Sequence, residues 1–221
     1  MEHHATLLMS EFITHDVKRF VVTRPEGFRW QPGQGVELAI DAPDWEQQKR
    51  PFTPTSLAED GVLEFSIKGY PEHNGVTAQL HRLEAGAKLL LSEPFGTIQY
   101  HGRGTFIAAG AGITPFLAII RKLARDEELD GHSLLFSNKG PQDIICEQEL
   151  RHCLGDAATF VCTRAGDCRC QEQRIDKAFL EQHIQELQQH FYLCGPPPFV
   201  TAVSDALREL GASPEALVFE R

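Results

Sequence analysis

The sequence changes character near His101, and this change limits the fold to two halves of different construction. Before it, short apolar and β-branched runs are separated by Pro and Gly, which is typical of antiparallel strands. After it, apolar runs alternate with amphipathic segments, as parallel strands and their crossover helices do. Since most domains have about 100 to 150 residues, a chain of 221 residues can form two. We predict two domains, residues 1–101 and residues 102–221.

The first half is predicted to form an antiparallel β-barrel, because its short strands follow one another closely with turn residues between them. The expected strands are residues 6–13, 17–23, 35–40, 62–68 and 87–91. One helix is expected over residues 76–83, since Val76, Leu80 and Leu83 recur at helical spacing.

The second half is predicted to form a parallel sheet with crossover helices, an α/β arrangement. Its expected strands are residues 105–109, 133–137, 159–162, 191–194 and 216–219, and its expected helices are residues 115–125, 143–153, 176–189 and 198–210. Thr114 and Pro115 suit the N-cap and first turn of the first of these helices. Gly211 suits the end of the last.

Charge and hydropathy exclude several kinds of partner. The net charge is -10 and no run of Lys and Arg forms a basic face, so nucleic-acid binding is not expected. The chain has no membrane-spanning run, and its N-terminus lacks the basic and apolar segments of a secretory signal. We therefore expect a cytoplasmic protein with no membrane partner.

The cysteines all lie in the second half and lack the dense spacing of a disulfide scaffold, so reduced thiols are expected. Cys162, Cys168 and Cys170 match neither common ferredoxin spacing for an iron–sulfur cluster. The histidines show no metal-ligand spacing either. No metal site is predicted.

The segment Gly110-Ala111-Gly112-Ile113-Thr114-Pro115 joins an apolar strand to a helix. Its glycines let the backbone approach phosphate oxygens, and the helix N-terminus offers unpaired amides, so the turn suits a pyrophosphate. Pro115 stands where the usual dinucleotide fingerprint has its third glycine. Taken alone, the segment fits an ordinary strand-to-helix turn equally well.

A second turn, Cys194-Gly195-Pro196-Pro197-Pro198, follows a later strand and should lie at the same edge of the sheet. Its glycine and prolines form a stiff ledge that suits a flat ring, with the Cys194 thiol beside it. Alternatively, the prolines only begin the last helix and Cys194 is a small buried apolar residue.

In the first half, Arg50-Pro51-Phe52-Thr53 is held extended by proline, so its side chains project in a set order. Arg50 suits a phosphate, Phe52 a ring face and Thr53 a ring nitrogen. The amides of His73–Thr77, at the start of the expected helix, suit the same phosphate. Singly, Arg50 fits a solvated charge and Phe52 a core residue. Together these residues predict a phosphorylated aromatic ligand.

These motifs occur in an order that resembles the ferredoxin-NADP reductase superfamily, especially flavodoxin reductases and oxygenase reductase components. The resemblance covers nearly the whole chain. Its motifs are Gln31-Pro32-Gly33-Gln34, Arg50-Pro51-Phe52-Thr53, Gly75-Val76-Thr77, Pro94-Phe95-Gly96, Gly110 to Pro115, Cys194 to Pro197 and Phe219-Glu220. Phe52 departs from the family, which usually has tyrosine there; ring stacking survives this change, so flavin binding is still expected.

The resemblance implies FAD in the barrel, NADPH or NADH in the second domain, and hydride transfer between their rings followed by release of single electrons. It implies that Thr53 bonds the reactive flavin nitrogen and that Cys194 lies near the nicotinamide, both as positioning groups. Glu220 completes the implied catalytic set. The implied cofactor-binding residues are Arg50, Pro51, Phe52, Thr53, Ile67, Lys68, Tyr70, Gly75, Val76, Thr77, Gly110, Ala111, Gly112, Ile113, Thr114, Pro115, Asn138, Lys139, Thr163, Arg164, Arg174, Cys194, Gly195, Pro196, Pro197 and Phe219.

Coenzyme choice depends on Thr163-Arg164 and Arg174, which occupy places where NADPH-using relatives often carry arginines, with Lys139 as a further cation. We expect NADPH over NADH, although similar residues occur in NADH users. The expected acceptor is a separate protein such as flavodoxin, ferredoxin or an oxygenase component. We expect the protein to be a monomer. Because the sequence ends at Arg221, no long terminal segment is expected to cover the flavin.

Two alternatives stay open. One is a reductase of free flavins or quinones. The other is a non-autonomous flavin-binding subunit of a larger redox complex, like those in dihydroorotate dehydrogenase or hydrogenase assemblies.

Overall fold

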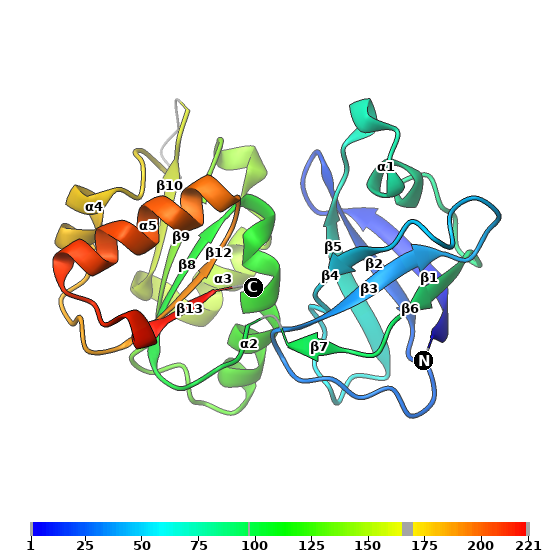
Figure 1. Ribbon diagram of the computed structural model, residues 1–221, viewed down its shortest axis with the longest axis horizontal. Helices are drawn as coiled ribbons and strands as arrows, with labels where there is room; N and C mark the ends of the chain where they lie inside the picture. Colours follow the sequence, from blue (N-terminus) through cyan, green and yellow to red (C-terminus); the bar gives the residue numbers. More distant parts are fainter. Residues whose placement is uncertain (1, 97, 165–169, 220–221) are drawn as a thin grey trace.

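A computed structural model describes residues 2–96, 98–164 and 170–219 and contains two bodies packed side by side (Figure 1). The N-terminal body is an antiparallel sheet that curls into a nearly closed barrel, with strand order β4-β3-β6-β1-β2-β5 and β7 paired to β3. Its elements are β1 (His3–Phe12), β2 (Val17–Thr23), β3 (Gln34–Ile40), β4 (Arg50–Phe52), β5 (Val62–Lys68), α1 (Val76–Leu80), β6 (Lys88–Leu91) and β7 (Phe95–Gly96). The predicted barrel is confirmed.

The C-terminal body is a parallel sheet of order β11-β10-β9-β8-β12-β13, with helices on both faces (Figure 1). Its strands are β8 (Gly104–Ala109), β9 (Ser133–Asn138), β10 (Ala158–Cys162), β11 (Gln171–Glu172), β12 (His190–Cys194) and β13 (Leu217–Phe219). Its helices are α2 (Thr114–Arg125), α3 (Glu147–Leu154), α4 (Lys177–His183) and α5 (Pro197–Leu210). This confirms the predicted α/β fold class. None of the described helices is long and apolar enough to cross a membrane.

Alternation along the central strands builds a core on each face of the parallel sheet. Phe106 and Phe136 pack toward α2 and α3, whereas their neighbours Ile107 and Leu135 pack toward α4 and α5. Successive side chains of a strand point to opposite faces, so both faces of a doubly covered sheet must be apolar. The barrel has its own core, built around residues such as Phe65.

Three helices are shorter than predicted. The helix expected over residues 76–83 ends at Leu80. The helix expected over residues 143–153 begins only at Glu147, because Pro141–Asp143 forms a 3-10 turn and Cys146 is left-handed, with φ 52°. The helix expected over residues 176–189 ends at His183. Residues 185–189 have one apolar side chain, Leu187, among four polar ones, so they offer little apolar surface to bury as a further helical turn. The short strands β4, β7 and β11 were not predicted, since two or three residues cannot display a period.

The expectation of reduced thiols is wrong for one pair in this structure. Cys162, the last residue of β10, forms a disulfide with Cys170, which lies just before β11. The Cα atoms are 5.8 Å apart and both side chains are buried. Spacing along the chain did not reveal this pair, because the pairing of β10 with β11 brings the two residues together.

Thiol titration tests the disulfide. Denatured, unreduced protein is expected to contain two fewer reactive thiols than the same protein after reduction with dithiothreitol, since Cys162 and Cys170 are joined. A Cys162→Ala, Cys170→Ala double variant should show no such difference. Equal thiol counts before and after reduction of the wild-type protein would contradict the assignment.

Candidate functional site

A cleft of about 810 Å³ lies between the two bodies, within the size range of small-molecule sites. Both bodies contribute to its walls. The barrel wall consists of Val17, Gly35, Pro51, Phe52, Thr53, Ser66, Ile67, Lys68, Tyr70 and Thr77. The opposite wall consists of Ala109, Gly110, Ala111, Gly112, Thr114, Pro115, Ser137, Asn138, Lys139, Asp143, Ile145, Thr163, Arg174, Cys194, Gly195, Pro196 and Phe199.

The barrel wall is set by β4 and β5. Pairing of β4 with β3 brings Pro51 and Phe52 to the cleft, where Phe52 also packs against the barrel core. Thr53 follows and is 8% exposed. A half-buried aromatic ring beside a buried hydroxyl can hold a flat heteroaromatic group, because the ring offers a face and the hydroxyl a hydrogen bond.

The opposite wall is set by the carboxyl ends of β8 and β12, which are neighbours in the parallel sheet. Between them the strand order reverses, since β9 lies on the other side of β8. Ligands of open α/β sheets bind at such a reversal. A Cβ atom on Gly112 would lie 2.3 Å from the carbonyl oxygen of Cys194, so the two turns are in direct contact and only glycine fits there.

Asn138 supplies a hydrogen-bonding group at the same edge. It ends β9, is only 4% exposed, and both polar atoms of its amide lack a partner among the described residues. Because buried polar groups are nearly always hydrogen-bonded, this amide fits a bound polar ligand. The contact of Gly112 with Cys194 and the orphaned Asn138 amide are two features of this structure that suit a dinucleotide.

Most predicted site residues meet in the cleft, but several do not. Arg50 is exposed and donates a hydrogen bond to the carbonyl of Lys49. Val76 and Ile113 are buried core residues. Also outside the lining are Gly75, Arg164, Pro197 and Phe219, while Glu220 lies outside the described residues.

The cleft also contains residues that sequence reasoning missed: Val17, Gly35, Ser66, Ala109, Ser137, Asp143, Ile145 and Phe199. Ser66 and Ser137 carried a usable signal, since Ser66 stands between two apolar residues of β5 and Ser137 directly follows the apolar run of β9. Both are buried, and the Ser66 hydroxyl lacks a partner in the described part of the chain. The other residues of this set line the cleft only because the fold places them there, and nothing in the sequence around them indicated it.

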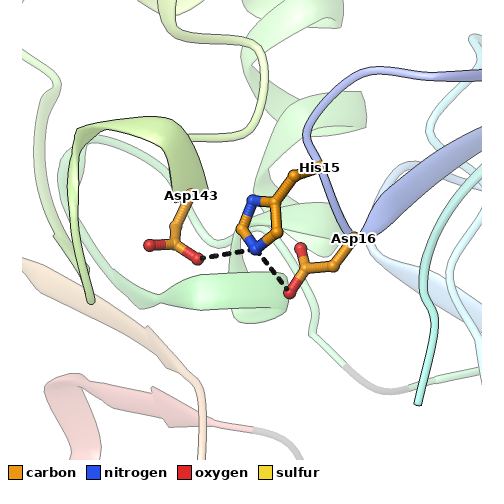
Figure 2. A group of neighbouring side chains, drawn as sticks. All are labelled: His15, Asp16 and Asp143. Carbon is orange, nitrogen blue, oxygen red and sulfur yellow. Dashed lines mark ion pairs between the residues drawn. The ribbon is translucent and has the colours of Figure 1, made fainter. Parts of the chain in front are cut away.

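A charged cluster joins the two bodies next to the cleft (Figure 2). His15 Nε2 lies 3.5 Å from Asp16 Oδ2 and 3.9 Å from Asp143 Oδ1. Burial would raise the pKa of the Asp16 carboxyl, but the hydrogen bond from Lys68, at 2.5 Å, helps to lower it below its usual value. Because the Lys68 ammonium already supplies a cation to this cluster, we interpret the cluster as ion pairs rather than as a metal site.

Two family descriptions match the chain. Residues 4–100 match an oxidoreductase FAD-binding domain, and residues 106–205 match an oxidoreductase NAD-binding domain. NADH-cytochrome b5 reductase 1 of Coccidioides immitis is 28% identical over 230 residues, covering 93% of this chain and 74% of the relative. The ferredoxin–NAD(P)(+) reductase component of the naphthalene 1,2-dioxygenase system of Pseudomonas putida is 26% identical, covering 95% and 66%.

Solved structures share the fold. The FAD/NAD-binding domain of nitric oxide dioxygenase from Vibrio cholerae superposes with a TM-score of 0.88 at 20% identity, covering 99% of this chain and 97% of that one. A ferredoxin NADP+ reductase from Neisseria gonorrhoeae with bound FAD and NADP gives a TM-score of 0.79 at 21% identity, covering 95% and 92%. At these identities the likeness concerns the arrangement of the two bodies.

Proposed function

The chain belongs to the ferredoxin-NADP reductase superfamily, and we propose that it passes electrons from NADPH to a separate protein acceptor. It is an NAD(P)H-dependent flavin oxidoreductase whose cofactors are FAD and a nicotinamide dinucleotide. Together the two cofactors supply hydride transfer followed by release of single electrons. We place the FAD domain at residues 1–101 and the NAD(P) domain at residues 102–221.

In this proposal the barrel wall holds FAD. Phe52 lies against the flavin ring and the Thr53 hydroxyl bonds its reactive nitrogen. Ile67, Lys68 and Tyr70, which also line the cleft, contact the ribityl or nucleotide part. Arg50 and the amides of Gly75–Thr77 bind the phosphates. Arg50 uses Nη1 for its hydrogen bond to the Lys49 carbonyl and can offer its other N–H donors to a phosphate.

The opposite wall holds the coenzyme. The turns Gly110–Pro115 and Cys194–Pro197 bring backbone close to the pyrophosphate and the nicotinamide. Asn138 donates to or accepts from the coenzyme, which satisfies its buried amide. Thr53 and Cys194, from opposite walls of one cleft, orient the two reacting rings and exclude water. Phe219 is proposed to contribute to cofactor binding and Glu220, which lies outside the described residues, to catalysis.

The single observation that carries this proposal is the shared cleft with Phe52 and Thr53 on one wall and the Gly112–Cys194 contact on the other. The test is to extract the bound flavin, identify it, and follow its anaerobic bleaching with NADPH and NADH in turn. FAD that bleaches faster with NADPH is the expected result. FMN as the bound flavin, or protein that stays colourless when supplied with FAD, would contradict the proposal.

Arg174 is expected to select NADPH, because it is the arginine of the predicted set that lines the cleft. Hydrogen bonds to charged groups contribute about 1.5–3 kcal/mol, so Arg174→Gln should raise the KM for NADPH roughly 10- to 100-fold. The KM for NADH should change little. Arg164→Gln is the matched control, since Arg164 is exposed and outside the lining. Steady-state kinetics with NADPH and with NADH measure the two KM values. An equal rise in both KM values would show that Arg174 does not contact the additional phosphate that distinguishes NADPH from NADH.

The proposed acceptor is flavodoxin, ferredoxin or an oxygenase component, and the protein is proposed to act as a cytoplasmic monomer. The relatives support a separate protein acceptor, since the Pseudomonas protein is named as a reductase component of a dioxygenase system. Faster turnover of small quinones than of any protein acceptor would favour the free-flavin or quinone reductase, and constant co-purification with a partner would favour the subunit of a complex.

A further inference from the structure

One guanidinium, that of Arg121 on α2, joins the two bodies. Its side chain is 19% exposed at the seam between them. Toward the barrel, Nη1 donates to the Thr55 carbonyl at 2.7 Å and to Glu64 Oε1 at 2.6 Å. Toward α3, Nε and Nη2 donate to the two carboxylate oxygens of Glu149 at 2.5 and 2.9 Å. The planar fork of an arginine thus fixes three groups at once.

On the barrel side, Arg121 holds the segment that carries Thr53. Thr55 and Glu64 are already tied together, since Thr55 N donates to the Glu64 carbonyl at 2.7 Å and the Thr55 hydroxyl to Glu64 Oε1 at 2.8 Å. The amide of Glu64 donates to Ser56 Oγ at 3.0 Å. Thr55 is two residues beyond Thr53, so movement of Thr55 relative to α2 also moves Thr53.

On the other side, Arg121 is rigidly connected to the coenzyme turn. Its helix begins at Thr114, directly after the 3-10 turn Gly110–Ile113, and Thr114 and Pro115 line the cleft. The bidentate contact with Glu149 keeps the guanidinium from turning away from the seam. One side chain therefore connects the wall that holds the flavin to the wall that holds the coenzyme.

The Arg121 guanidinium and the carboxylates of Glu64 and Glu149 form one network of opposite charges. Burial would lower the pKa of Arg121, but the Glu149 and Glu64 carboxylates raise it above its ordinary value. The hydrogen bond from Arg121 lowers the pKa of Glu149. A partly buried ion pair of this kind adds little net stability compared with apolar packing, whereas its geometry is specific. Removing Arg121 alone would leave the Glu64 and Glu149 carboxylates without this partner, so its loss is expected to change both the relative position of the bodies and the free energy of unfolding.

We propose that Arg121 is a positioning residue for hydride transfer, which sets the distance between the two cofactor-bearing walls through Thr55, Glu64 and Glu149. This inference rests on the proposed function. Reaction rates depend steeply on the separation of reacting atoms, and a misplacement of about 1 Å can cost about 100-fold. Loss of the clamp should therefore slow the chemical step while both cofactors still bind.

The test is Arg121→Gln, with Arg125→Gln as the matched control. Arg125 lies one turn later on α2 and reaches Glu59 of the barrel across the same seam, at 2.9 Å, through an exposed ion pair. Both variants remove one positive charge from the same helix. In anaerobic stopped-flow mixing with NADPH, the limiting rate of flavin reduction should fall roughly 10- to 100-fold in Arg121→Gln. It should stay within about 2-fold of wild type in Arg125→Gln, since exposed pairs contribute little.

Further readouts separate positioning from general stability. Flavin content and the apparent Kd for NADPH should be close to wild type in Arg121→Gln, with the kinetic loss confined to the limiting rate. The thermal unfolding midpoint should fall, because Glu64 and Glu149 lose this partner, so the rates are compared well below that midpoint. Arg121→Lys should recover part of the rate, since it restores the charge and a donor but not the fork. If Arg121→Gln does not fold, Glu149→Gln weakens the same clamp from α3 and should slow the same step to a smaller extent.

Three outcomes would overturn the inference. They are an unchanged limiting rate in Arg121→Gln, an equal loss in Arg121→Gln and Arg125→Gln, and a loss explained entirely by weaker NADPH binding. If wild-type protein with bound FAD is bleached by neither NADPH nor NADH, the proposed function itself fails. That result is distinct from all three.

Discussion

Gly112→Ala is expected to lower NADPH-dependent flavin reduction by more than about 100-fold and the free energy of unfolding by about 3 kcal/mol. The added methyl group would lie 2.3 Å from the Cys194 carbonyl oxygen, 2.5 Å from its carbon and 2.7 Å from the Gly195 nitrogen. All three are backbone atoms, so no side chain can rotate away. The ends of β8 and β12 must separate, which displaces Cys194 and the ledge that follows it. Stopped-flow reduction and denaturant unfolding measure the two effects.

Two glycine variants serve as controls for Gly112→Ala. At Gly61 a Cβ atom meets nothing within 4 Å and φ is not positive, so Gly61→Ala should change neither rate nor stability measurably. At Gly110 the space is also open but φ is +54°, so Gly110→Ala should cost about 1 kcal/mol through backbone strain alone. If Gly112→Ala resembled Gly61→Ala in both measurements, the direct contact between the two turns would be disproved.

Cys194→Ala is expected to slow single-turnover flavin reduction by about 100-fold while FAD remains bound. Cys194 is 7% exposed at the end of β12, and its side chain lies in the cleft wall opposite Thr53. Removing the sulfur leaves the nicotinamide without the atom proposed to hold it in place, so the ring can shift relative to the flavin. Because the FAD-binding residues are on the other wall, flavin content should not change. Anaerobic mixing with NADPH, together with the ratio of flavin to protein, measures both quantities.

Cys153→Ala is the control for this variant, since Cys153 is half-buried on α3 and packs against the core away from the cleft lining. It should reduce flavin at the wild-type rate. Cys194→Ser keeps most of the volume and should lose less activity than Cys194→Ala. An unchanged single-turnover rate in Cys194→Ala would refute the positioning role, whereas loss of flavin would show that Cys194 acts on the barrel domain.

The two-domain architecture could be predicted from the amino-acid sequence, because strand and helix periods are local properties. The short runs at residues 17–23 and 62–68, separated from their neighbours by turn residues, predicted β2 and β5 with the bounds observed. The glycines and prolines of the Gly110 and Cys194 turns were readable for the same reason, since each sets the backbone of its own neighbourhood. The order of these motifs along the chain carried the resemblance to the family.

Which side chains meet in the cleft depends on how the elements pack in three dimensions. Arg174 lines the cleft and Arg50 and Arg164 do not, although all three are arginines in suitable segments. The Cys162–Cys170 pair and the clamp of Arg121 on Thr55, Glu64 and Glu149 likewise follow from contacts between residues of different strands and helices. The burial of the Asn138 amide, which has no partner among the described residues, also depends on tertiary packing. Such contacts depend on how the two sheets pack and meet at the seam. No period or spacing along the chain encodes that packing, because it is the joint result of many long-range contacts.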